Sequence, residues 1–363
     1  MKAVKILITS IFLIALVAGC TQPPVPTPVP DPAPEPNQEQ TLSITDIFPF
    51  HEDTLILFDL SGGIGSTAYY TVFTEGNRMQ RLVTLGTFRV TEVFEIADGE
   101  LRVNHARAMA SGFENMLDVK DDNPMVILRE PLVVGNSWET HTGPTMLGVA
   151  RGVSTITAVD LEIETAVGLV SAIEVSTEFE NGFVEVNYFA KGVGLVQSGH
   201  FLPGFELEQG TTRFIQEEMN VDMLLASAAE GAALQVDIRV YHPNEDADDL
   251  DFSENTAPFM TNGDIRELFE SVLRHPGERP HGIISPNTTI NFIDVSWVQA
   301  EDNPANENAT VHLDLSEDFS NDMSVGITYE QLILASLEIT FLEFFSADEF
   351  VLTVAGQPHV SIH

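Results

Sequence analysis

Residues 43–214 show short apolar runs in which hydrophobic and polar positions often alternate, with turn residues between the runs. A repeat of two residues is typical of strands that bury one face. The dipeptides Asp98-Gly99 and Asn181-Gly182 tolerate positive φ, so each predicts a tight hairpin turn. We therefore expect a mainly antiparallel β domain over this range.

The pattern changes over residues 215–233, which are rich in Ala, Glu, Leu and Met. These residue types favour helices, and they separate two regions with strand-like periodicity. We expect a linker with a short helix here, and we place the domain boundary within it.

The second domain, 234–363, has the predicted order β-α-β-β-α-β. Its first helix has apolar residues at helical spacing, is capped by Thr261 or Asn262, and ends before His275-Pro276-Gly277. The predicted strands are 234–242, 289–299, 309–316 and 349–358, and a second helix covers 328–345. Two helices on one face of a four-stranded sheet would give a compact α/β domain. The expected fold class is thus mixed: a mainly antiparallel β domain followed by an α/β domain.

Two resemblances accompany these patterns. Glycine and aromatic positions in 127–140, 164–177 and 186–198 resemble a β-rich module of secreted and lipid-anchored bacterial proteins. Gly135, Gly192 and Gly194 are expected to have positive φ or close backbone contacts, with Trp138 and Tyr188 buried beside them.

The second resemblance covers residues 234–360. "VDIRVYHPNEDADDL", "VHLDLSEDF" and "VLTVAGQP" resemble segments of the GerMN domain. Two places depart from its pattern, because His275-Pro276-Gly277 replaces a Gly-Pro pair and Val354-Ala355-Gly356 replaces Val-Asp-Gly. The resemblance implies an envelope lipoprotein, of the kind found in spore formation and germination, that works by assembly.

Within "DLSEDF", four positions form a candidate motif: Asp314, Leu315, Ser316 and Phe319. The carboxylate of Asp314 and the hydroxyl of Ser316 are suited to capping backbone groups, and Phe319 to packing on the second helix. We interpret the motif as structural, with partner docking as the alternative.

The N-terminus predicts a membrane anchor. Lys2 and Lys5 precede an apolar run of about twelve residues, too short for a span of about 20. Leu16 to Cys20 resembles a bacterial lipobox, which implies a signal peptide over 1–19 and lipidation, including palmitate, at Cys20. Residues 20–42 form the predicted stalk, and its proline-rich part, Pro23 to Pro36, favours an extended conformation of roughly 40 Å. An ordinary signal peptide is the alternative.

The charge limits the partners. The formal net charge is −39, from 16 basic and 55 acidic residues. This argues against nucleic acid and against binding anionic lipid or wall polymers through bulk charge. A solvated acidic surface, typical of saline or alkaline surroundings, is the simplest interpretation.

Candidate chemistry is sparse. Asn244, Asp246 and Asp248 lie in an acidic loop and suggest a weak Ca²⁺ site, but Asp249 and Asn255 occupy the positions where an EF-hand has Gly and Glu. The histidines show no metal spacing, and the Gly-rich segment 61–67 lacks a phosphate-loop lysine. Paired carboxylates for glycoside chemistry remain open.

We therefore expect a non-enzymatic lipoprotein, held outside the cytoplasm by its lipid anchor, without a cofactor. It would act as an assembly module in the cell envelope through protein or peptidoglycan contacts, with sporulation or germination as the setting that the resemblance implies. The alternatives are a peptidoglycan-binding or peptidoglycan-turnover accessory, and a cation- or solute-binding lipoprotein.

Overall fold

The computed structural model describes residues 42–61, 65–86, 88–108, 111–142, 150–201, 203–208, 211–216, 220–276, 282–299, 307–323 and 327–359. The chain divides into two units, Met1–Gln40 and Thr41–His363, and all described residues belong to the second. This unit is mostly β, as expected for its first part.

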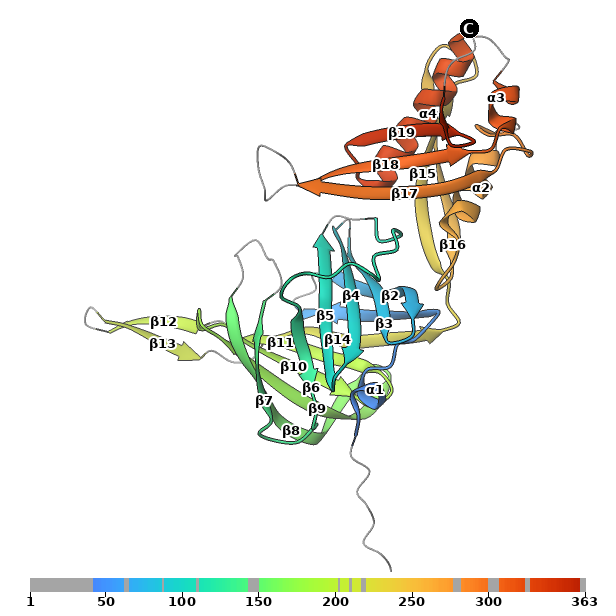
Figure 1. Cartoon of the computed structure of the whole chain (residues 1–363). Helices are drawn as coiled ribbons and strands as arrows, with labels where there is room; N and C mark the ends of the chain where they lie inside the picture. Colours follow the sequence, from blue (N-terminus) through green and yellow to red (C-terminus); the bar gives the residue numbers. More distant parts are fainter. Residues whose placement is uncertain are drawn as a thin grey trace, which may run out of the picture. The chain divides into compact units, whose positions relative to one another are not determined.

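Twelve strands form one antiparallel sheet, in the order β6-β5-β4-β3-β2-β1-β14-β11-β10-β9-β8-β7 (Figure 1). A four-residue helix, α1 (Ile44–Ile47), precedes it, and β12 and β13 form a separate pair. The strands are β1 (Thr54–Leu60), β2 (Gly65–Glu75), β3 (Arg78–Leu85), β4 (Phe88–Ala97), β5 (Glu100–Ala108), β6 (Met125–Arg129), β7 (Ser137–His141), β8 (Arg151–Thr165), β9 (Gly168–Phe179), β10 (Val184–Ala190), β11 (Gly194–Phe201), β12 (Pro203–Glu208), β13 (Thr211–Gln216) and β14 (Asn220–Glu230).

Side chains close this sheet along the seam between its edge strands, β6 and β7. The indole Nε1 of Trp138 donates to the carbonyl oxygen of Val126 at 3.2 Å, and the hydroxyl of Thr140 donates to the same oxygen at 2.9 Å. Asn136 Nδ2 donates to the carbonyl oxygen of Arg129 at 2.8 Å. Side-chain donors thus bind carbonyls on the edge of β6, and the sheet is nearly closed.

The predicted turns are confirmed. Asp98 and Gly99 both have positive φ, 55° and 72°, and join β4 to β5. Gly182 has φ 81° between β9 and β10. Positive φ is also found at the other glycines singled out from the sequence, and both aromatic residues beside them are buried: Gly135, Gly192, Gly194, Trp138 and Tyr188.

The expectation of a linker with a short helix over 215–233 is wrong for most of that range, because residues 220–230 form β14. This strand pairs with both β1 and β11 in the middle of the large sheet, and its Leu225 is fully buried. Its Ala- and Leu-rich composition favours a helix, but pairing on both sides overrides that local preference.

The C-terminal part consists of a two-stranded ribbon, helices and a four-stranded sheet. The ribbon pairs β15 with β16, and the sheet has the order β17-β18-β19-β20, in which β18 and β19 are parallel. The elements are β15 (Leu234–Pro243), β16 (Leu250–Phe259), α2 (Ile265–Arg274), β17 (Ile290–Gln299), β18 (Glu307–Leu315), α3 (Asp318–Asp322), α4 (Ile327–Phe345), β19 (Glu349–Val354) and β20 (Gln357–Pro358).

Most predicted elements of this part are present, but the predicted order β-α-β-β-α-β is wrong in two respects. Strand β16 was missed, and β15 pairs with it instead of joining the four-stranded sheet. The cap of α2 is also different: Asp264 accepts a hydrogen bond from the backbone N–H of Arg266. Thr261 and Asn262, the expected caps, instead bind the large sheet.

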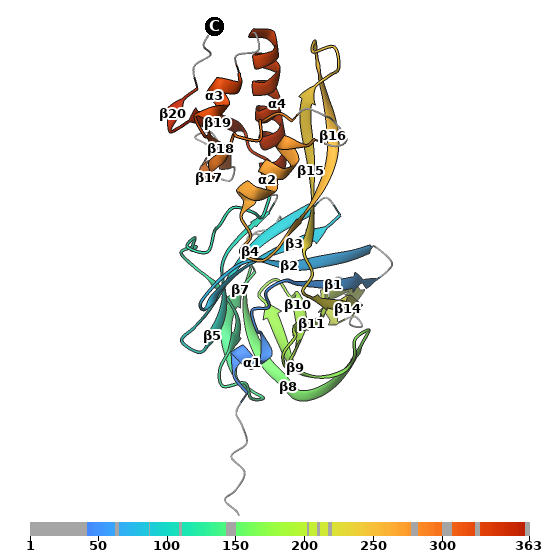
Figure 2. The same cartoon turned by 90° about the vertical axis from the view of Figure 1, so that its right-hand side faces the viewer.

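Helices α2 and α4 lie between the ribbon and the four-stranded sheet (Figure 2). The rings of Phe269 and Phe341 stack with their centroids 4.4 Å apart, and Phe345 lies against both. Covering α4 on two sides explains why it is apolar around most of its circumference. None of the described helices is long and apolar enough to cross a membrane.

The ribbon is tied to the large sheet by direct bonds. Tyr70 donates from its hydroxyl to the carbonyl oxygen of Phe259 at 3.0 Å. Asp53 and Thr261 exchange two hydrogen bonds, each 2.7 Å long. The ring of Phe113 packs against Phe259 at 5.0 Å, so one apolar core continues from the large sheet into the C-terminal helices.

Candidate functional site

Asp314 lies near the end of β18 and is 3% exposed. Its Oδ1 accepts hydrogen bonds from the hydroxyl of Thr353 at 2.5 Å and from the backbone N–H of Gly356 at 2.8 Å. Its Oδ2 accepts from Asn291 Nδ2 at 2.8 Å. One carboxylate therefore joins β17, β18, β19 and the turn that precedes β20.

The pKa of Asp314 is lowered although burial works to raise it. Hydrogen bonds from Thr353, Asn291 and Gly356, together with the nearby His312, more than offset the loss of solvation. Asp314 is therefore held as a carboxylate whose oxygens are engaged by protein donors. This arrangement fits the structural interpretation of the motif.

The other motif positions also serve the fold. Leu315 and Phe319 are fully buried in the core, and the ring of Phe319 lies 5.6 Å from the ring of His359. Ser316 pairs with Thr289: its backbone N–H donates to the carbonyl of Thr289, and its hydroxyl accepts from the backbone N–H of Thr289. The sequence motif thus fastens the end of β18.

The outer face of the C-terminal sheet is the side turned away from α4, and its side chains form rows across three strands. Phe292, Asp314 and Thr353 form one row, because they are cross-strand partners. Asp294, His312 and Val351 form the next, and Ser296, Thr310 and Glu349 form the third. We refer to these nine residues and Val298 as the outer face.

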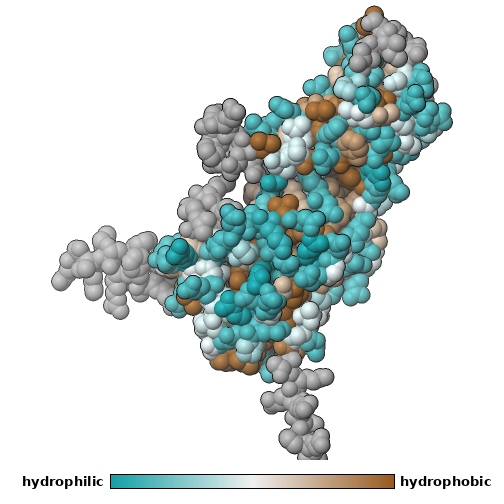
Figure 3. Space-filling model, viewed as in Figure 1, coloured by the Kyte–Doolittle hydropathy of each residue, from teal (hydrophilic) through white to brown (hydrophobic). Residues whose placement is uncertain are grey.

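Three apolar side chains of the outer face are exposed: Phe292 by 38%, Val351 by 42% and Val298 by 64%. The ring of Phe292 stands edge-on to the ring of His312 at 4.7 Å, and His312 Nε2 lies 2.9 Å from the hydroxyl of Thr353. In the space-filling view, hydrophobic residues are interspersed with hydrophilic ones on the visible side of the chain (Figure 3). The outer face is a mixed surface typical of non-obligate protein interfaces.

The side-chain amide of Asn244 forms hydrogen bonds across the acidic loop. Asn244 Nδ2 donates to Asp248 Oδ1 at 2.7 Å, and Asn244 Oδ1 accepts from the backbone N–H of Asp248 at 3.1 Å. Among the described residues, the hydrogen bonds across this loop join Asn244 to Asp248 and Asp249, and Asp246 is not part of them. The described residues contain no group of three or more His, Cys, Asp or Glu suited to a metal. The weak cation site stays a prediction.

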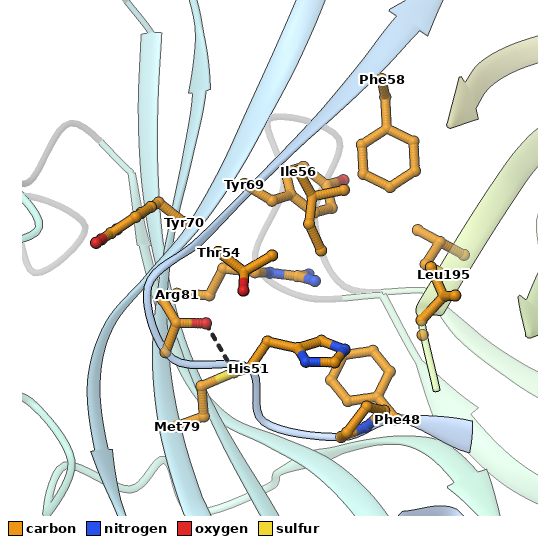
Figure 4. Close-up of a pocket in the computed structure, with 14 residues that line it drawn as sticks. Phe48, His51, Thr54, Ile56, Phe58, Tyr69, Tyr70, Met79, Arg81 and Leu195 are labelled. Carbon is orange, nitrogen blue, oxygen red and sulfur yellow. Dashed lines mark hydrogen bonds between the residues drawn. The ribbon is translucent and has the colours of Figure 1, made fainter. Parts of the chain in front are cut away.

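A small cavity lies inside the large sheet beside Arg81 (Figure 4). Its volume is about 30 Å³, enough for one or two water molecules. Arg81 forms an ion pair with Glu92 at 2.7 Å, and its guanidinium lies 4.2 Å from the Tyr69 ring centre. Burial raises the pKa of Tyr69 to about 12. The cavity belongs to the core and has no room for a larger ligand.

Several sequence candidates remain without a structural counterpart. Cys20 and the stalk lie outside the described residues, as does His281. His51 Nε2 donates one hydrogen bond to the carbonyl oxygen of Gly192 at 2.8 Å, and His275 ends α2. The Gly-rich segment is only partly described.

Comparison with protein-family models, with curated proteins and with solved structures finds no match.

Proposed function

We propose that this chain is a lipid-anchored protein of the cell envelope that acts outside the cytoplasm as a non-catalytic assembly module. Lipidation at Cys20 would hold it to the membrane, and the proline-rich stalk would extend the folded part away from it. The GerMN-like segments add sporulation or germination as the setting of this proposal.

The observation that carries the proposal is the outer face. The described helices cover one side of the C-terminal sheet. The other side exposes Phe292, Val298 and Val351, and polar outer-face residues lie between them. Aromatic and aliphatic side chains surrounded by polar groups are suited to protein contacts that form and dissociate.

The motif residues support the same proposal. Asp314 engages both its oxygens with protein donors, so it holds the strands beneath the outer face in fixed positions. A rigid backbone lowers the conformational entropy that a partner must overcome on binding.

Site-specific crosslinking in living cells tests this function. A photoreactive amino acid at position 292 should capture one defined envelope protein. The matched control is position 169, because Leu169 is 64% exposed but lies on the large sheet. Equal capture from both positions, or no capture from 292, would refute an assembly role for the outer face.

The anchor is tested separately by Cys20→Ser. We expect this variant to leave the membrane fraction while its unfolding transition matches that of the wild-type chain, since Cys20 does not belong to the unit Thr41–His363. Continued membrane retention would contradict the proposed lipid anchor.

A further inference from the structure

A second surface lies along the free edge of the C-terminal sheet. Among the described strands, β17 ends this sheet. At its start, the edge is occupied by α2: Ile290 donates its backbone N–H to Glu270 Oε1, and the carbonyl of Asn291 accepts from Arg266. Farther along, Ile293, Asp294 and Val295 line a cleft of about 450 Å³.

The opposite wall of this cleft comes from the loop between β5 and β6, which carries Glu114 and Asn115. The side chain of Gln80 holds this loop, because its amide nitrogen donates to the carbonyls of Gly112 and Glu114 at 2.9 and 2.7 Å. Its oxygen accepts from the backbone N–H of Met116 at 2.7 Å. The wall is therefore fixed before any ligand arrives.

Glu114 is the unusual group in this wall. It is only 9% exposed, and its Oε2 accepts a hydrogen bond from the backbone N–H of Gly112 at 3.0 Å. Its Oε1 is buried, so a ligand in the cleft does not reach this oxygen directly. Glu114 therefore contributes its charge to the wall of the cleft, where Arg107 is the nearby cation.

The charges around the cleft select the type of ligand. Glu114, Asp264 and Asp294 line it, while the one basic residue among the described lining residues, Arg266, is paired with Asp264 at hydrogen-bond distance. The whole chain carries −39. A cationic ligand is complementary to this cleft, and an anionic one is not.

We propose that the cleft binds an extended basic segment of a partner polypeptide, which lies along β17 and places lysine or arginine side chains beside Glu114 and Asp294. The free edge supplies backbone groups for strand addition, and the acidic residues supply specificity. This inference rests on the assembly function proposed above and identifies the chemistry of one partner segment. The competing interpretation is a water-filled joint in which Asp294 protects the edge from strand pairing.

Binding of a labelled probe peptide tests the inference. The probe is end-blocked Lys-Val-Lys-Val-Lys, its control is Glu-Val-Glu-Val-Glu, and the protein is the full chain in detergent, followed by fluorescence anisotropy. We expect the lysine peptide to bind and Glu114→Gln to weaken it at least about tenfold. Glu245→Gln removes the same charge from the exposed acidic loop and should change Kd less than about twofold.

Three results would overturn the inference: no binding of the lysine peptide, equal weakening by both substitutions, or equal affinity for acetyl-lysine methylamide, which has no chain to extend. Hydrogen exchange adds a structural test, since the bound peptide should slow exchange of the β17 amides beyond Asn291. Unchanged exchange would exclude strand addition. Crosslinking from position 292 is independent of the probe, so it distinguishes failure of this inference from failure of the assembly function.

Discussion

Replacing Asp314 tests how the C-terminal sheet is held together. Asp314→Ala removes an acceptor that three donors share, namely Thr353, Gly356 and Asn291, in a site that is 3% exposed. Each hydrogen bond to a charged group contributes about 1.5–3 kcal/mol, but the three are not additive because they share one carboxylate. We expect a loss of about 3–5 kcal/mol in the free energy of unfolding.

Asp314→Asn separates charge from shape. The amide oxygen can still accept from Thr353 and Gly356, while its nitrogen faces the donor of Asn291. Because Asn291 can turn its own amide to offer an oxygen, we expect a smaller loss of about 1–2 kcal/mol. The direction in which stability changes with pH also follows from the lowered pKa of Asp314. The folded pKa of Asp314 lies below its usual value of 3.8, so its stabilisation is complete above that pH and is lost on further acidification.

Urea unfolding at pH 7 and near pH 3, followed by tryptophan fluorescence, measures these changes. Trp297 lies on β17, beside the affected strands. Asp294→Ala is the matched control, since Asp294 is an exposed outer-face carboxylate on the neighbouring strand β17, and its loss should lower the free energy of unfolding by less than about 0.5 kcal/mol. A free energy of unfolding of Asp314→Ala within about 1 kcal/mol of the wild-type value would refute this reasoning, because about 1 kcal/mol is the lower limit expected for breaking such a hydrogen-bond network.

Three further predictions follow from buried polar groups. Gln80→Met should lower the free energy of unfolding, measured with urea, by about 3 kcal/mol, because three backbone groups of the β5–β6 loop lose their hydrogen-bond partner. A loss below about 1 kcal/mol, which is about one net hydrogen bond, would contradict this prediction. Trp138→Phe should lower the free energy of unfolding by about 1–2 kcal/mol and should speed hydrogen exchange of the β6 amides relative to those of β3. Unchanged exchange would show that the Trp138 hydrogen bond does not stabilise the contact between β6 and β7. Burial raises the pKa of Glu114 above its usual value of 4.5, so the stability linked to its protonated form is present below pH 4.5 and is lost as pH rises. Glu114→Gln should therefore raise Tm at pH 8 but not at pH 4. An equal shift of Tm at both pH values would refute this linkage.

Periodicity along the chain was sufficient for some elements and failed for others. Strands β17 and β18 and helix α4 were expected because each shows a sustained repeat of one type. Strand β16 was missed since "LDFSENTAPF" contains few apolar residues and a proline, and it is a strand because β15 pairs with it along its whole length.

The candidate site could be predicted only in part. The sequence indicated that Asp314 and Ser316 bind backbone groups, but their partners Asn291, Thr353 and Gly356 come from separate elements and cannot be inferred from spacing. Glu114 was not singled out at all. It lies in an irregular loop among 55 acidic residues, and only the folded chain shows that one of its oxygens is buried.

The outer face and the cleft meet at β17, and this shared strand links the two proposals physically. Side chains alternate along a strand, so Phe292 and Asp294 belong to the outer face while Ile293 and Val295 point toward the helices. A segment added along the free edge would continue that alternation and extend the outer face by one strand beside Phe292. Binding in the cleft would thus enlarge the proposed contact surface, and both proposals depend on the same strand positions, which Asp314 fixes.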